Sequence, residues 1–281
     1  MLRGKADVTA REVDMVTAEM NVRLFHIRKL LEGVDYQPVA NVPSLDVEQY
    51  GKPERIAALV RAHWGVPNGP IKNLTRLMER AGIIVGQSDF GGASISGVTF
   101  KAPGNPALVV VSSTAPADRM RFTLAHELGH LVMHRFPTPD METEANTFAS
   151  AFLMPERDIL PAFAGRQVTL ELLAGLKLEW RVAMQALLMR ARGLDIVTAN
   201  QNRYLWQQIS ARGWRLREPP ETDFPREVPS VMTKLISSHL DQLGYSFDDL
   251  LRMNRETESD FVNLYGRIQS DPPQRPMLRV V

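Results

Sequence analysis

The sequence contains no cysteine, no long apolar run and no excess of charge of one sign. Without cysteine, disulfides and thiolate metal sites are excluded, so a metal ion could be held only by histidine and carboxylate side chains. No stretch approaches the roughly 18 apolar residues of a membrane-spanning helix, and the N-terminus lacks the apolar segment of a secretory signal peptide. We therefore expect a cytoplasmic protein without membrane contact.

The composition is that of an ordinary globular protein. Lysine and arginine total 33 against 32 acidic residues, a net charge of +1, so the overall field does not favour a nucleic-acid or membrane partner. The chain has 281 residues, of which 44% are hydrophobic, which excludes disorder of the whole chain. This length allows one sizeable core and a smaller appended unit.

Apolar periodicity predicts an α+β fold in which a small sheet is followed by a mainly helical C-terminal region. Residues 11–31 repeat apolar side chains at steps of three and four, which is typical of a helix with one buried face. Short strands are expected at 83–85, 97–100 and 107–111, separated by Gly- or Pro-containing turns. Further helices are expected at 54–63, before Gly82, and near 116–134, 140–154, 169–176, 181–192, 202–211, 231–243 and 246–266.

One of these helices carries an H-E-x-x-H motif, residues 126–130. His126 and His130 are four residues apart, so they project from the same face of a helix and can reach one zinc ion. Glu127 is turned about a hundred degrees away, which suits a general base acting on zinc-bound water as that water attacks a peptide bond. The alternative is an amphipathic helix whose histidines recur by chance. His134 lies about 12 Å of helix rise from His126, so it is expected to support the site rather than bind the ion.

The third ligand should come from the next helix, because the turn at Pro137 and Pro139 folds it back beside the motif helix. Glu142 and Glu144 both qualify by distance. Glu142 is favoured because it shares a small, apolar face suited to close packing, whereas Glu144 points elsewhere and is expected to be solvated. Asn146, one turn after Glu142, is either an acceptor for the free ring N–H of a ligating histidine or a helix-packing amide.

Two sequence blocks carry a family resemblance. Residues 121–134 read RFTLAHELGHLVMH and residues 142–155 read ETEANTFASAFLMP. These blocks resemble the ImmA/IrrE family of metallopeptidases, and weaker similarity covers most of residues 50 to 217. The resemblance implies a zincin-like sheet and a thermolysin-like site with one zinc per chain. Its ligands would be His126, His130 and Glu142, with Glu127 as base and Asn146 in the place where thermolysin-like enzymes use aspartate.

The resemblance also implies a biological role. Members of the family are typically intracellular regulators that cleave a partner repressor and so release genes of stress responses or mobile elements. We therefore expect a zinc endopeptidase acting on a DNA-binding regulatory protein, whose chain would lie against an exposed edge strand at residues 107–111. The competing hypothesis is a transcriptional regulator or antitoxin-like binding module with a structural or vestigial zinc site.

The expected organisation has five segments. Residues 1–50 form a helix and linker, 51–165 the metallopeptidase domain, 166–217 a helical unit, 218–230 a Pro-rich linker, and 231–281 C-terminal helices with a Pro-rich tail. Within the helical unit, residues 169–192 are similar to a helix-turn-helix. Four of its polar side chains could face DNA, but the near-zero net charge favours a packing helix with solvated arginines: Arg181, Gln185, Arg190 and Arg192.

Overall fold

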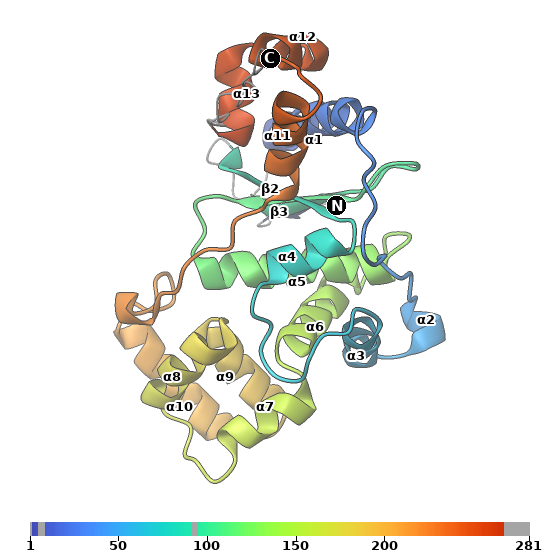
Figure 1. Cartoon of the computed structure of the whole chain (residues 1–281). Coiled ribbons are helices and arrows are strands. Elements are labelled where there is room, and N and C mark those ends of the chain that lie inside the picture. The colour runs from blue at the N-terminus through green and yellow to red at the C-terminus, as the bar shows by residue number, and fades with distance from the viewer. Residues whose placement is uncertain (1, 5–8, 91–94, 267–281) are drawn as a thin grey trace, which may run out of the picture.

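A computed structural model describes residues 2–4, 9–90 and 95–266. Helices cover both faces of a small mixed sheet, so the α+β prediction is confirmed (Figure 1). Within the described residues, no helix has both the length and the apolar content needed to cross a membrane. The expected Pro-rich tail lies outside the described residues.

The sheet has four strands in the order β1, β3, β4, β2. β3 (Ile95–Phe100) runs antiparallel to both β1 (Leu2–Gly4) and β4 (Leu108–Ser112), while β2 (Ile84–Ser88) runs parallel to β4. β4 is therefore an interior strand, and the expectation of an exposed edge at residues 107–111 is wrong. The physical reason is its continuous apolar sequence, which is buried along its whole length and covered by helices on both faces.

The N-terminal and C-terminal helices share one face of the sheet (Figure 1). There, α1 (Ala10–Leu31) contacts α11 (Val231–Asp241) and α12 (Phe247–Asn254), and α13 (Glu258–Tyr265) completes the layer. These helices and the strands form one apolar core that includes Leu24, Ile27, Ile84, Val110, Ile236 and Phe261. Segments from opposite ends of the chain thus build one side of the protein.

The single helix expected over residues 246–266 is two helices in the structure. Arg255 adopts a left-handed backbone conformation with a φ of 56° and ends α12. The side chain of Thr257 then accepts a hydrogen bond from the backbone N–H of Asp260, which starts α13. The capping residue rather than a break in apolar periodicity therefore marks this boundary.

The helix with the H-E-x-x-H motif, α5 (Ala117–Met133), crosses the other face of the sheet. It packs on α4 (Leu74–Arg80) and on α6 (Met141–Leu153), and α6 in turn packs on α3 (Pro53–His63), which follows the short α2 (Val47–Tyr50). Their shared core includes Val85, Val109, Leu124, Leu128, Phe148 and Phe152.

Four further helices extend this core away from the sheet (Figure 1). They are α7 (Glu156–Phe163), which the sequence did not predict, α8 (Leu170–Trp180), α9 (Met184–Gly193) and α10 (Ala199–Ala211). α8 packs on α9 in a two-helix unit, and the apolar side chains of α8 to α10 belong to the same core as those of α5 and α6.

The Pro-rich segment 218–230, which includes a short 3-10 helix (Pro220–Thr222), is held against the protein near both of its ends. The carboxylate of Glu218 is buried and accepts a hydrogen bond from the backbone N–H of Met184 at 3.0 Å. The carboxylate of Glu227 is also buried and accepts from Thr75 N at 2.7 Å, at the start of α4.

Arg121 of α5 connects that segment to the rest of the core. Its guanidinium forms an ion pair with Glu227, and it is almost fully buried. It also donates to the backbone oxygens of Ile71 at 2.8 Å and Arg181 at 3.0 Å. One arginine therefore connects α5 with the loop before α4, the end of α8 and the Pro-rich segment.

Candidate metal centre

The middle of α5 packs tightly against strand β3. A Cβ atom at Gly97 would lie 2.5 Å from Thr123 Cγ2 and 3.3 Å from Glu127 Oε1. A larger residue would force the Thr123 side chain or the helix to shift, so glycine is favoured here by space rather than by backbone conformation. This contact sets the distance between the motif residues of α5 and the sheet.

His126 and His130 face Glu142 from one side of α5. The two Nε2 atoms are 2.9 Å apart, and the Glu142 carboxylate oxygens lie 3.4 Å from His126 Nε2 and 3.3 Å from His130 Nε2. Both imidazoles are buried, whereas the Glu142 side chain is 56% exposed. The structure thus brings the three expected ligands together, with solvent access on the side of α6.

The second ring nitrogen of His126 is held by Asn146. Asn146 Oδ1 lies 3.0 Å from His126 Nδ1, and because an amide oxygen only accepts, Nδ1 carries the hydrogen. The lone pair of His126 therefore lies on Nε2, which faces Glu142. This is the supporting contact considered from the sequence, and it fixes both the tautomer and the ring orientation.

His130 is oriented by a longer chain of contacts. Its Nδ1 lies 2.9 Å from His134 Nδ1, and His134 Nε2 lies 2.9 Å from Glu144 Oε2. Because the carboxylate accepts from His134 Nε2, neutral His134 accepts at Nδ1, and His130 Nδ1 must donate. Glu144 is therefore not free in solvent as expected, and it does not contact the candidate ligands. It is turned instead toward His134, at the C-terminal end of α5.

The donor atoms fit a divalent metal ion. Three groups each offer one ligand atom within 4.8 Å of one another: His126, His130 and Glu142. Both nitrogens present lone pairs, and these three electron-rich groups are the type that zinc prefers. Two ligand atoms on one tetrahedral zinc are roughly 3.4 Å apart, given bond lengths of about 2.0 to 2.1 Å. The nitrogen–oxygen distances match this value, and the nitrogen–nitrogen distance needs only a small opening.

Glu127 lies beside the ligands but is oriented by the sheet. Its carboxylate is fully buried, and Thr99 Oγ1 of β3 donates to Glu127 Oε2 at 2.5 Å. Sequence reasoning missed Thr99, because nothing in the local pattern of a short strand shows which side chain will meet the helix. The contact gives the carboxylate a fixed direction, which a proton-transfer group needs.

The glycine within the motif sets the position of α6. A Cβ atom at Gly129 would lie 3.1 Å from Phe148 Cδ1 and 3.3 Å from Ala145 Cα. Because one of these atoms belongs to the backbone of α6, a larger residue would move that helix. Gly129 therefore allows the close helix–helix contact that places Glu142 opposite the two histidines.

The side chains considered for DNA contact make contacts within the protein. Arg190 is buried and donates to Met154 O at 3.1 Å, and Gln185 Nε2 donates to Trp214 O at 3.1 Å. Arg181 donates to Lys72 O at 2.7 Å. Arg192, which is more exposed, donates to Val197 O at 3.3 Å. These contacts favour the alternative in which α8 and α9 are packing helices.

Comparison with known families completes the description of the site. Residues 78–192 match the model of the IrrE N-terminal-like domain, the Peptidase M78 family. This segment contains the whole metal centre, from Thr99 to Asn146. Over this segment the chain is similar to the IrrE N-terminal-like domain. The resemblance seen in residues 121–134 and 142–155 is therefore confirmed.

This similarity indicates a metallopeptidase-type role. The matched region begins within α4 and ends within α9, so α1 to α3 and α10 to α13 lie outside it. No curated protein sequence matches the chain at a significant level.

Proposed function

We propose that this protein is a zinc-dependent endopeptidase that cleaves a regulatory protein such as a transcriptional repressor. The observation that carries the proposal is the convergence of His126 Nε2, His130 Nε2 and Glu142, with the buried carboxylate of Glu127 beside them. A purely structural metal site has no chemical need for such a carboxylate. The family match supports peptide-bond cleavage as the reaction.

Each side chain has a distinct part in the proposed reaction. When bound, zinc would act as a Lewis acid on the scissile carbonyl and make water a stronger nucleophile. Glu127 would accept a proton from the attacking water and deliver it to the leaving amine, acting first as base and then as acid. The Thr99 hydrogen bond keeps its carboxylate pointing in one direction throughout.

The supporting residues keep the ligands in place. Asn146 holds His126 with its lone pair toward Glu142, and His134 with Glu144 does the same for His130. Because the rings are fixed before any ion binds, little conformational entropy is lost on binding. The proposed site, with three ligands and Glu127 as base, would be of the zincin type.

The proposal is tested by comparing the zinc-loaded protein with its Glu127→Gln variant. Both should bind about one zinc per chain, because Glu127 is not a ligand. Incubation with a cell lysate, followed by labelling of new N-termini and mass spectrometry, should show cleavage products only with the wild-type protein. Equal sets of termini from the two proteins, at full zinc occupancy, would contradict the proposal.

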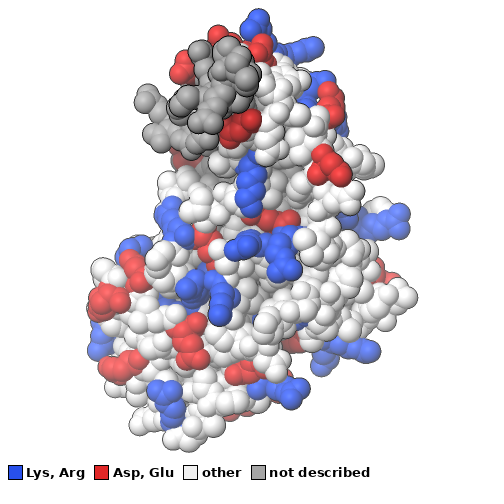
Figure 2. All heavy atoms as spheres, in the orientation of Figure 1, with Lys and Arg blue, Asp and Glu red and all other residues white. Residues whose placement is uncertain are grey.

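The binding-module alternative has less support from the described surface. On the face that Figure 2 shows, basic and acidic side chains are interspersed, without a large basic patch. Titration with duplex DNA at several salt concentrations tests it, since binding through phosphates weakens steeply as salt rises. Tight, salt-sensitive binding together with no cleavage would favour a regulator with a structural zinc site.

A further inference from the structure

A cavity of about 470 Å³ lies beside the metal centre. It is bounded by the first turns of α5, by α6, by α9 and by the segment after α10. This volume lies within the range of pockets that bind small ligands or several side chains, roughly 300 to 1,000 Å³. The lining residues on which the inference rests are Phe122, Asn146, Ala186, Met189 and Leu216.

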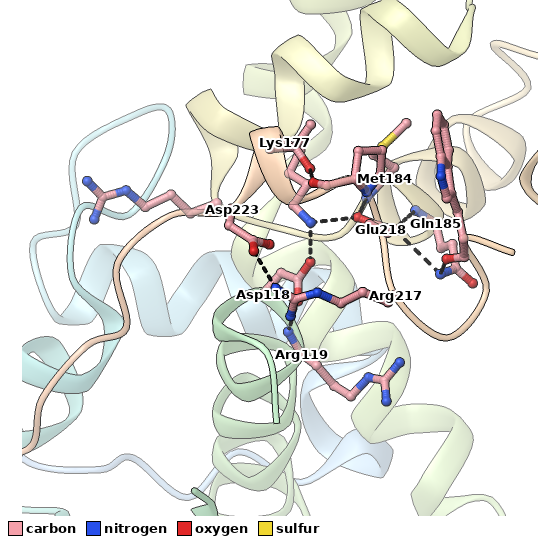
Figure 3. Close-up of polar contacts among 12 residues, drawn as sticks. Asp118, Arg119, Lys177, Met184, Gln185, Arg217, Glu218 and Asp223 are labelled. Carbon is pink, nitrogen blue, oxygen red and sulfur yellow. Dashed lines mark hydrogen bonds and ion pairs between the residues drawn. The ribbon is translucent and has the colours of Figure 1, made fainter. Parts of the chain in front are cut away.

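The inner end of the cavity is polar, but its charges are matched. Lys177 Nζ donates to Asp118 Oδ2 at 2.6 Å and to Glu218 Oε2 at 2.8 Å (Figure 3). Burial alone would lower the pKa of Lys177, but its hydrogen bonds and ion pairs with the two carboxylates outweigh burial and raise the pKa. Glu218 also accepts from the backbone N–H groups of Met184 and Gln185. The buried charges are thus satisfied internally, and they hold the cavity walls in position.

The outer lining of the cavity is open to solvent and combines an apolar wall with Arg119 and the Arg217–Asp223 ion pair. Met189 of α9 is 65% exposed and Leu216 is 84% exposed, and both line the cavity together with the half-buried Phe122 and Ala186. Large apolar side chains gathered around a hollow gain free energy when another apolar group covers them. The apolar wall therefore favours an apolar occupant, whereas the buried charges behind it are paired with one another.

The cavity adjoins the candidate metal centre at Asn146. Asn146 lines the cavity and at the same time contacts the ring of the ligand His126. Phe122 lies one helical turn before His126 on α5, on the cavity side. A peptide whose backbone is seated at Glu142 and His126 can therefore place a neighbouring side chain in the cavity.

We propose that this cavity is a specificity subsite that binds large apolar side chains, such as leucine, methionine or phenylalanine, next to the scissile bond of the substrate. The inference rests on the proposed peptidase function, because the position of the cavity next to the candidate ligands selects the occupant. It adds that cleavage sites carry an apolar residue near the cut and that Met189, Leu216 and Ala186 determine this preference.

Peptide binding tests the subsite without requiring cleavage. The zinc-loaded Glu127→Gln protein is titrated against two fluorescein-labelled peptides, Ala-Ala-Leu-Met-Ala-Ala and Ala-Ala-Ser-Ser-Ala-Ala, with anisotropy as the readout. The Leu-Met peptide should bind about tenfold or more tightly than the Ser-Ser peptide, since burying two apolar side chains is favourable.

Variants locate the binding. Ala186→Trp fills the cavity and Met189→Asp places a charge on its wall, and each should weaken binding of the Leu-Met peptide about tenfold. Met15→Asp is the matched control, because Met15 is likewise an exposed methionine but lies on α1, outside the cavity lining. Its binding should equal that of the parent protein. Thermal melting checks that every variant is folded, and Met189→Asp, at an exposed position, keeps the test valid if Ala186→Trp is unstable.

Two results would overturn the subsite. The first is equal affinity for the two peptides, and the second is unchanged affinity in a folded Met189→Asp protein. Cleavage mapping separates this failure from that of the proposed function. If the wild-type protein cleaves its substrates at sites without any apolar preference, the proposed peptidase function is retained and the subsite is rejected. Cavity-dependent binding without any cleavage would retain an apolar peptide site and reject the peptidase.

Discussion

Two buried histidine sites lie on opposite faces of the same sheet. On one face, His26 of α1 has its Nδ1 2.9 Å from the Tyr265 hydroxyl and its Nε2 3.4 Å from Glu256 Oε1. The ring is surrounded by aromatic side chains, and burial lowers the pKa of His26 to about 4. On the other face, His126 and His130 are just as buried, but their Nε2 atoms point at each other and at Glu142.

The difference shows which property distinguishes the candidate metal site from an ordinary buried histidine. Burial is common to both sites, so burial alone carries no functional information. At His26 the neighbouring groups are a phenol, one carboxylate and aromatic rings, which together pack a neutral imidazole. At the metal centre, separate hydrogen bonds hold both histidines so that several lone pairs meet at one point. Convergence of electron pairs, and not burial, distinguishes the second site.

The largest effect should come from removing one ligand. We expect His126→Ala to weaken zinc binding by roughly a thousandfold or more, because structural zinc sites gain ~10–16 kcal/mol from only a few ligands. His26→Gln should retain the zinc of the wild-type protein, about one ion per chain. Elemental analysis after dialysis, with a competing chelator titration, measures both. Loss of zinc from a folded His26→Gln protein would contradict the assignment of zinc binding to the site of His126, His130 and Glu142.

The next largest effect should be the pH dependence of stability that comes from His26. Its folded-state pKa of about 4 lies below the ordinary 6.5, so its contribution is fully present above pH 6.5 and is lost as pH falls toward 4. At about 1.4 kcal/mol per pKa unit, the free energy of unfolding should fall by up to about 3 kcal/mol in this window.

Urea unfolding of the zinc-free Glu142→Ala protein, with and without His26→Gln, isolates this contribution from acid release of the metal. The steeper decline below pH 6.5 should vanish in the double variant. If the two proteins show parallel pH profiles, His26 is not the group responsible.

A smaller effect is expected where a side chain supports a ligand without binding the ion. Asn146→Ala and Glu144→Gln each remove a contact that orients a histidine, so zinc affinity should fall about 10- to 100-fold. Competition with a fluorescent zinc chelator gives the dissociation constants. If Glu144→Gln instead abolished binding as fully as Glu142→Ala, then Glu144 would be a ligand and the site would need revision.

The smallest effect concerns the contact between α5 and α6. Gly129→Ala should lower the free energy of unfolding by about 1 kcal/mol, because its Cβ would press on Phe148 and on the backbone of α6. Gly175→Ala is the matched control: it lies within α8 with nothing within 4 Å of its added Cβ, so it should be stabilising by ~0.5–1 kcal/mol. Chemical denaturation measures both, and equal shifts in the same direction would show that packing at Gly129 is not tight.

Local patterns predicted the motif helix and the helix after it closely. The spacing of His126 and His130 placed them on one face, and the prolines at 137 and 139 indicated the reversal that brings Glu142 back. These inferences succeed because helix periodicity and turn residues act over a few positions.

Contacts between distant segments could not be predicted in the same way. The interior position of β4, the Thr99–Glu127 hydrogen bond and the pairing of α1 with the C-terminal helices depend on tertiary packing. Glu144 shows the same limit within the site. Its place on α6 was correct, but its partner depends on where His134 lies after α5 ends.

The contacts of Arg121 determine where the chain can be truncated without loss of stability. A chain cut after residue 217 would lose Glu227 and leave the Arg121 guanidinium buried within α5 without its carboxylate. Leaving such a charge uncompensated typically costs about 3–5 kcal/mol, a large share of the stability of most domains. The helix that bears the two candidate histidine ligands is therefore not expected to fold without the C-terminal part of the chain, because Glu227 lies more than a hundred positions downstream of Arg121.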